Sequence, residues 1–227
     1  VGFYIMAIHE IFPTNIVIQD IELSEKQTKD LIIAIESLFL HNYGVPRDSA
    51  ISGENKLTSG NCADPMAVFT AENIKVFTVL KDIKEIFING FYELSQSYEN
   101  SNLTREVISN LFENDFGQLP IMKKGQNMPA HTHPGCIASA VFYLTDVDNE
   151  KDGGQLVLRD PSWHSTPAFR NSMEYEINTK AGRLVVFPVH VWHEVTSYFG
   201  DKDRVTMVAN LSYMNSEFVN HVHIEAY

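Results

Sequence analysis

The sequence has few cysteines, no excess of basic residues and no long hydrophobic run. Its two cysteines, Cys62 and Cys136, are too few for the disulfide framework of a small secreted domain. Lysine and arginine number 17 against 29 aspartate and glutamate residues, so the net charge is −12 and no basic face suits nucleic acid. No segment reaches the roughly 18 to 20 apolar residues that cross a bilayer, and the start lacks the pattern of a signal peptide. We therefore expect a cytoplasmic protein that binds neither nucleic acid nor membrane.

The sequence does contain enough apolar material for one folded core. The chain has 227 residues, of which 44% are hydrophobic and 11% aromatic, and these values are ordinary for a globular protein. We predict a single domain over residues 1–227. Its character changes near residue 115, because residues 1–115 are mainly helical in pattern and residues 116–227 are rich in strand-like runs.

Three segments of the first half show the apolar spacing of helices. The first, Ser24–His41, begins with a serine suited to cap the helix and has a glutamine three residues later. The second covers Glu72–Glu99, although Gly90 weakens its middle. The third covers Thr104–Phe112. We expect these apolar faces to form core rather than a binding surface.

The second half contains short strand-like runs that are separated by turn signals such as Asp152-Gly153-Gly154 and Lys180-Ala181-Gly182. Runs at this spacing favour an antiparallel sandwich or barrel. The predicted fold class is therefore α+β and mainly β. The predicted strands are Gln118–Lys123, Ile137–Thr145, Gly154–Leu158, Glu174–Ile177, Arg183–Pro188, Glu194–Phe199 and Arg204–Ser212.

Four histidines in this half form two clusters that suit a metal ion. His131 and His133 form an H-x-H pair, and alternate residues of an extended chain point to the same side, so both imidazoles can face one metal. His190 and His193 come later, after a strand-like run, and either can supply a third ligand. Three ligands on one face of an octahedron leave positions for a cosubstrate and O₂, as in non-haem iron(II) oxygenases. Imidazole also suits Zn, Cu and Ni, so the ligand type does not name the metal.

The motifs around these histidines follow a definite order. The H-x-H precedes a strand ending in Phe142-Tyr143-Leu144, and then come a Gly153-Gly154 turn, the run Gly182-Arg183-Leu184-Val185-Val186-Phe187, His193 and Arg204. This order resembles the prolyl-4-hydroxylase-like branch of the 2-oxoglutarate/Fe(II)-dependent dioxygenases. It is most similar to a group of 2-oxoglutarate/Fe(II) oxygenases in which the first motif is often H-x-H-P. The specific motifs cover residues 131–210.

The resemblance implies a fold, cofactors and residue roles. The fold is a double-stranded β-helix, or jelly roll, with the N-terminal helices packed on it. The cofactors are Fe(II), 2-oxoglutarate as cosubstrate and O₂, and the reaction is hydroxylation of an organic substrate with release of succinate and CO₂. The catalytic metal ligands are His131, His133 and His193, with His193 preferred to His190 because it directly precedes Glu194-Val195. Arg204 forms the salt bridge to the far carboxylate of 2-oxoglutarate.

Three hydroxyl side chains are candidates to assist Arg204. Thr206 points with Arg204 if their strand alternates regularly, and Thr206 can then add a hydrogen bond to the cosubstrate. Tyr143 and Ser139 lie on one face of an earlier strand by the same argument, so that either hydroxyl can reach the same carboxylate.

The sequence departs from the family pattern at one ligand. The second ligand is usually a carboxylate, and here it is His133, so the site carries one less negative charge. That change alters the redox potential of the iron and its hold on 2-oxoglutarate. Two alternatives follow: a cupin-like three-histidine dioxygenase or isomerase without 2-oxoglutarate, and a non-catalytic metal-binding jelly-roll protein whose site is closed by a fourth ligand.

The substrate class and the assembly are open at this stage. We expect a small molecule or a protein side chain as substrate, and the N-terminal helices are suited to pair two protomers as a homodimer. The stretch Asp160–Ser172, with Trp163, His164 and Phe169, is either a lid over the site or a plain surface loop.

Overall fold

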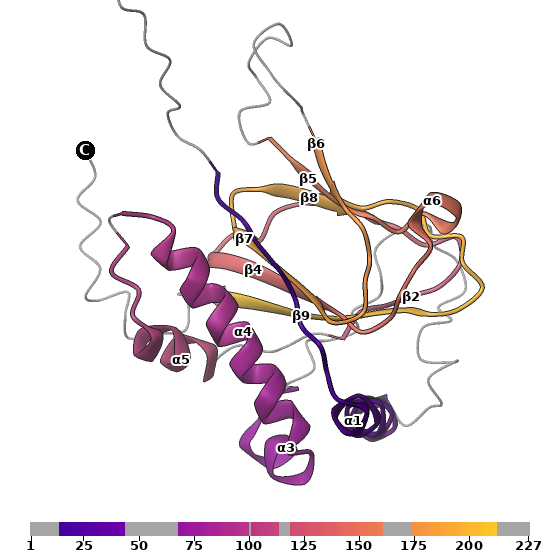
Figure 1. Ribbon diagram of the computed structural model, residues 1–227, viewed down its shortest axis with the longest axis horizontal. Coiled ribbons are helices and arrows are strands. Elements are labelled where there is room, and N and C mark those ends of the chain that lie inside the picture. Colours follow the sequence, from indigo (N-terminus) through magenta and orange to yellow (C-terminus); the bar gives the residue numbers. More distant parts are fainter. Residues whose placement is uncertain (1–13, 44–67, 100, 114–118, 161–173, 213–227) are drawn as a thin grey trace, which may run out of the picture.

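Two antiparallel β-sheets face one another, and helices cover the outer side of the larger sheet (Figure 1). The computed structural model describes residues 14–43, 68–99, 101–113, 119–160 and 174–212. The larger sheet has the strand order β1-β7-β4-β9-β2, and the smaller has the order β3-β8-β5-β6. All the strand pairs within the two sheets are antiparallel. The predicted α+β, mainly β fold class is confirmed.

The elements have the following bounds. The helices are α1 Glu25–Tyr43, α3 Ala71–Val76, α4 Val79–Gln96, α5 Arg105–Glu113 and α6 Asn149–Asp152. The strands are β1 Val17–Asp20, β2 Ile121–Met122, β3 Met128–His131, β4 Cys136–Tyr143, β5 Leu156–Arg159, β6 Glu174–Ile177, β7 Arg183–Pro188, β8 Trp192–Val195 and β9 Arg204–Ser212.

The sheets separate two sets of side chains because residues alternate along each strand. On β4, Ala138, Ala140 and Phe142 pack among the helices, whereas Ser139, Val141 and Tyr143 line a cavity between the sheets. The same alternation on β9 sends Val205, Met207 and Ala209 to the helices and Arg204, Thr206 and Val208 to the cavity. The larger sheet therefore has a hydrophobic outer face and a partly polar inner face.

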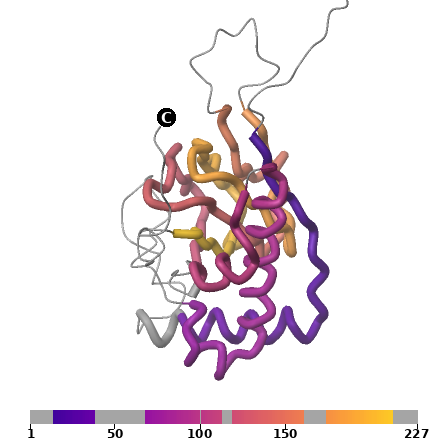
Figure 2. Tube along the Cα trace, turned by 90° about the vertical axis from the view of Figure 1, so that its left-hand side faces the viewer, coloured from indigo at the N-terminus to yellow at the C-terminus, as the bar shows by residue number. Residues whose placement is uncertain are grey.

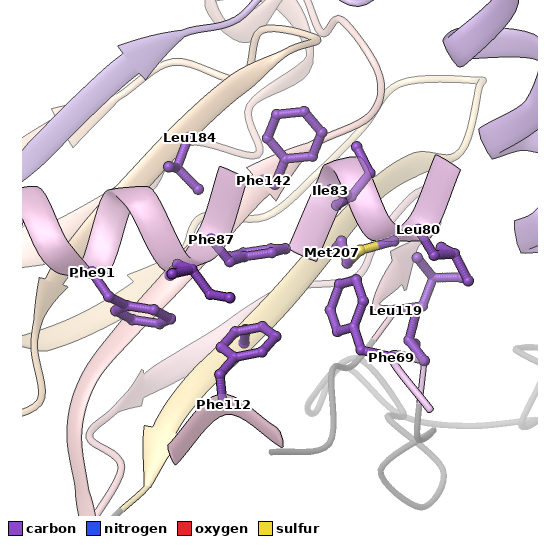
Figure 3. Packing of buried hydrophobic residues seen from close by; sticks show 14 of the residues in the cluster. Phe69, Leu80, Ile83, Phe87, Phe91, Phe112, Leu119, Phe142, Leu184 and Met207 are labelled. Carbon is purple, nitrogen blue, oxygen red and sulfur yellow. The ribbon is translucent and has the colours of Figure 1, made fainter. Parts of the chain in front are cut away.

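Helix α4 provides most of the cover on the outer face. Figure 3 shows Phe87 of α4 between Phe142 of β4 and Phe112 of α5, and the Phe87 ring lies 6.4 Å and 6.0 Å from these two ring centroids. Gly90 allows α4 to approach β7 closely, since a Cβ atom there would lie 2.5 Å from the Leu184 side chain. The glycine that weakens the helix in isolation thus permits its packing against the sheet.

Helix α1 runs crosswise to α4 at one end of the sheets (Figure 2). The predicted capping pair is present: the Gln27 backbone N–H donates to Ser24 Oγ, and the Ser24 backbone N–H donates to Gln27 Oε1. No helix in the described ranges is long and apolar enough to cross a membrane.

Three predictions about the elements were wrong in detail. The single helix predicted over Glu72–Glu99 is two helices, because Phe77 leaves the helical conformation at φ −117° and ψ 85°. Strands β1 and β3 were missed: β1 is a short, mostly exposed edge, and β3 contains a proline. The strand predicted over Glu194–Phe199 instead covers Trp192–Val195, because its pairing with β5 sets its bounds. Most of the predicted Asp160–Ser172 loop lies outside the described residues.

Candidate functional site

The cavity between the sheets has a volume of about 80 Å³ and contacts all seven predicted site residues. The residues at its two ends can be located along strand β5 of the smaller sheet. His193 is paired with Leu158 at one end of β5, whereas Arg204 reaches the Gly154 carbonyl just before the other end. The cavity therefore connects a histidine cluster at one end with a buried arginine at the other.

The structure brings His131, His133 and His193 together. His131 of β3 and His193 of β8 are direct partners in the sheet register, and His133 follows β3 by two residues. One ring nitrogen from each histidine lies within 4.8 Å of the others. Among the described histidine, cysteine, aspartate and glutamate residues, these three form the group that is suited to hold a metal ion.

The backbone sets which nitrogen of two of the rings faces the shared point. The Nδ1 of His131 lies 2.7 Å from the Pro129 carbonyl oxygen, and the Nδ1 of His193 lies 3.1 Å from the Val191 carbonyl oxygen. A carbonyl only accepts, so each Nδ1 carries the hydrogen and each Nε2 presents a lone pair. The Nε2 of His133 lies 3.1 Å from the Nε2 of His193. These nitrogens converge as ligands of one ion do.

Burial keeps two of these imidazoles neutral. Burial, together with the nearby His131, lowers the pKa of His133 to about 4. Burial lowers the pKa of His193 to about 3, although the hydrogen bond to the Val191 carbonyl acts in the opposite direction. A metal ligand must be deprotonated, so both histidines are ready to bind at neutral pH.

The competing candidate, His190, lies outside the cluster. Its side chain is exposed in the turn after β7, while His193 is buried. No carboxylate of the described residues joins the three histidines. In the described part of the fold, therefore, no carboxylate from elsewhere takes the place of the usual carboxylate ligand that His133 replaces.

Arg204 lies at the other end of the cavity and is only 3% exposed. Its Nε donates to the Gly154 carbonyl at 3.0 Å and to Thr179 Oγ1 at 3.3 Å. The guanidinium carbon lies 5.3 Å from the centre of the Tyr143 ring. Burial lowers the pKa of Arg204, and within the described residues no carboxylate pairs with it.

The three predicted hydroxyl residues differ in their partners. The Tyr143 hydroxyl is buried and has no hydrogen-bond partner in the described part of the chain, and burial raises its pKa. Thr206 is 2% exposed and pairs with Tyr143 across β9 and β4. The Ser139 hydroxyl instead donates to Asn210 Oδ1 at 2.8 Å. The Tyr143 hydrogen therefore remains available to a ligand, whereas the Ser139 hydrogen is engaged by Asn210.

Two further residues near Arg204 were not predicted. Thr179 precedes β7 and contacts the arginine directly, and Asn149 of α6 accepts a hydrogen bond from the Thr179 backbone N–H at 2.7 Å. The sequence signal close to these two residues is the Gly153-Gly154 pair, which predicts a turn. Both glycines have positive φ angles, of 69° and 77°. No local pattern links residues 149 and 179, because folding alone brings them together.

Residues 119–210 match the family model described as "Putative 2OG-Fe(II) oxygenase". This segment carries the pattern of the 2OG-Fe(II) oxygenase family. The predicted resemblance to the 2-oxoglutarate/Fe(II) oxygenases is confirmed for this segment. The matched segment contains all seven predicted site residues. A comparison with curated protein sequences gave no match.

Solved structures with a similar fold include three prolyl hydroxylases. The Trichoplax adhaerens enzyme, in complex with a hypoxia inducible factor peptide fragment, has a TM-score of 0.55 and 12% identity, over 87% of this chain and 83% of that chain. A Pseudomonas putida prolyl-4-hydroxylase has a TM-score of 0.51 and 16% identity, over 88% and 92%. A Phytophthora capsici prolyl 4-hydroxylase has a TM-score of 0.52 and 14% identity, over 90% and 60%. At these identities the likeness shows a shared fold.

Proposed function

We propose that the protein is an Fe(II)- and 2-oxoglutarate-dependent oxygenase that hydroxylates an organic substrate and releases succinate and CO₂. The observation that carries the proposal is the buried guanidinium of Arg204, which faces the same cavity as the three-histidine cluster. A dicarboxylate with one end on a metal and the other on Arg204 fits this arrangement.

The electrostatics of Arg204 favour an anionic ligand. Its side chain is almost wholly buried, and its described partners are the neutral Gly154 carbonyl and the Thr179 hydroxyl. A buried charge without a counter-charge costs several kcal/mol. A guanidinium pairs with a carboxylate through two parallel hydrogen bonds, which compensate that charge. A bound carboxylate would therefore stabilise the site as well as be held by it.

The three histidines suit an iron(II) ion. Imidazole is a good ligand for Fe(II), and three ligands leave open positions for a bidentate cosubstrate and O₂. Iron(II) bound there would supply O₂ activation coupled to the decarboxylation of 2-oxoglutarate. The chain itself contributes neutral imidazoles, a cation at Arg204, and the Tyr143 and Thr206 hydroxyls that can bond the far carboxylate.

The two alternative functions account less well for these contacts. A structural metal site is normally closed by a fourth protein ligand, and the group suited to hold a metal in the described residues has three members. A three-histidine dioxygenase or isomerase without 2-oxoglutarate does not require a buried arginine that lacks a carboxylate partner among the described residues. Both observations support the proposed cosubstrate.

We further propose that the two facing sheets form a double-stranded β-helix and that residues 1–227 act as one oxygenase domain. The close packing of α4 on the larger sheet supports this, because the helices and the strands share one hydrophobic cluster. We propose a small molecule or a protein side chain as the substrate.

Succinate formation tests the function. The protein would be incubated with Fe(II), ascorbate and 2-oxoglutarate, and succinate would be measured for the wild type, Arg204→Ala and Arg105→Ala. Arg105 is a matched control because it lies exposed on α5 and pairs with Glu85 away from the cavity. We expect turnover in the wild type and the control and its loss in Arg204→Ala. Absence of both 2-oxoglutarate binding and succinate in the wild type would refute the proposal.

A further inference from the structure

We propose that Thr179 is a positioning residue that orients Arg204 toward the far carboxylate of 2-oxoglutarate. The inference rests on the proposed function and concerns a residue outside the expected ligand set. Thr179 lies between β6 and β7, far in sequence from Arg204, and is 4% exposed.

Thr179 and Gly154 together hold one edge of the guanidinium group. The Thr179 hydroxyl donates to the Gly154 carbonyl at 3.1 Å, so its lone pairs remain available to Arg204. The Arg204 Nε–H points at both oxygens, at 3.0 Å from the Gly154 carbonyl and 3.3 Å from Thr179 Oγ1. Because Nε is engaged in this way, the two terminal nitrogens form the edge that remains for a carboxylate.

The backbone next to each of the two oxygen acceptors is bonded to the same side chain, that of Asn149. The Thr179 backbone N–H donates to Asn149 Oδ1 at 2.7 Å, and Asn149 Nδ2 donates to the Gly153 carbonyl at 2.6 Å. At Gly154, a Cβ atom would lie 3.2 Å from Arg204 Cδ, and its φ angle of +77° favours glycine. Asn149 thus links Thr179 to the Gly153-Gly154 turn, which lies directly against the arginine.

This arrangement has a consequence for affinity. A free arginine side chain has many rotamers, and ordering it on binding weakens the complex. An arginine already held at Nε keeps its terminal nitrogens oriented, so less ordering remains when a dicarboxylate binds. Loss of the Thr179 hydroxyl should therefore weaken ligands that reach Arg204 and leave ligands that touch only the metal unchanged.

Calorimetry on the Mn(II)-loaded full chain can separate these effects. Binding of 2-oxoglutarate and of pyruvate, which lacks the far carboxylate, would be measured for the wild type, Thr179→Val and Thr179→Ser. Thr196→Val is the matched control, because the Thr196 hydroxyl bonds Gln155 at the same end of the smaller sheet without contacting Arg204. Thr179→Val would also be combined with Arg204→Lys. Lysine has no guanidinium Nε–H, so the double variant tests whether Thr179 acts through that group of Arg204.

We expect Thr179→Val to weaken 2-oxoglutarate binding about tenfold, as for the loss of one hydrogen bond to a charged group. Pyruvate binding should not change, Thr179→Ser should bind like the wild type, and Thr179→Val should cause no further loss in the Arg204→Lys background. Equal weakening of both ligands, or no rescue by serine, would overturn the inference. If Thr179→Val does not fold, Thr179→Ala replaces it. Wild-type protein that binds no 2-oxoglutarate would instead refute the proposed function.

Discussion

The unpaired hydroxyl of Tyr143 leads to a prediction with two opposite parts. The side chain is fully buried, and its hydroxyl has no partner in the described residues. A buried hydroxyl without a hydrogen bond costs about 1–3 kcal/mol. Tyr143→Phe removes that hydroxyl and keeps the ring against Arg204. The variant without metal or cosubstrate should therefore be more stable than the wild type, by at least about 1 kcal/mol. For a chain of this length the Tm should rise by about 2–4 °C.

Addition of 2-oxoglutarate should reduce the stability advantage of the variant by about 1.3 kcal/mol. If the hydroxyl donates to the bound carboxylate, its removal loses about 1.5–3 kcal/mol and weakens binding about tenfold or more. At a ligand concentration of about 100 times the wild-type Kd, the wild type gains about 2.7 kcal/mol of stability. A tenfold weaker variant gains only about 1.4 kcal/mol under the same conditions. The ligand-induced rise in Tm should be about half as large in the variant.

Thermal unfolding with and without Mn(II) and 2-oxoglutarate measures both parts. Tyr198→Phe is the matched control, because the buried Tyr198 hydroxyl donates to the Lys202 carbonyl at 2.5 Å. Its removal should lower the Tm by leaving that carbonyl without its partner. If Tyr143→Phe lowers the Tm of the ligand-free protein as Tyr198→Phe does, the hydroxyl is paired in solution and the reasoning fails.

Three further predictions concern the core and the metal site. Gly90→Ala should destabilise the protein by about 1–3 kcal/mol in urea unfolding, because the new methyl group meets Leu184 at 2.5 Å; a gain in stability would show that α4 can shift. His193→Ala should abolish binding of one metal equivalent in elemental analysis and His190→Ala should retain it, and the opposite result would assign the ligand to His190. In the metal-free protein the pKa is lowered to about 4 for His133 and to about 3 for His193. At a pH below the ordinary histidine pKa of 6.5, the unfolded state therefore binds more protons than the folded state. Stability should fall as the pH drops from 6.5 toward 3, and His193→Gln should make that fall shallower in acid-unfolding curves.

The local alternation of the strands made much of the site predictable. Successive side chains of a strand point to opposite faces, so the sequence alone places Ser139 with Tyr143 and Arg204 with Thr206. The structure confirms that these four line one cavity. For the same reason, the two-residue spacing of His131 and His133 predicts that both imidazoles can face one metal. These inferences need only the geometry of an extended chain.

Features that depend on distant segments were not predictable. Strand β1 is short and mostly exposed, and it pairs with β7 across most of the chain length. The helix ends at Phe77 without a local proline or glycine, and the apolar spacing continues through it, so the sequence pattern predicts one helix where the structure has two.

The sequence by itself identified the candidate site residues: a histidine pair, a later histidine and an arginine, in an order that resembles one family. The motif order already favoured His193 over His190, and the tertiary structure places His193 beside the pair through the register of β3 with β8. Only the tertiary structure showed that Arg204 is buried without a described counter-charge and is held by Thr179. Burial and hydrogen bonding at Arg204 arise when the two sheets close over the cavity, and no local pattern in the chain encodes that closure.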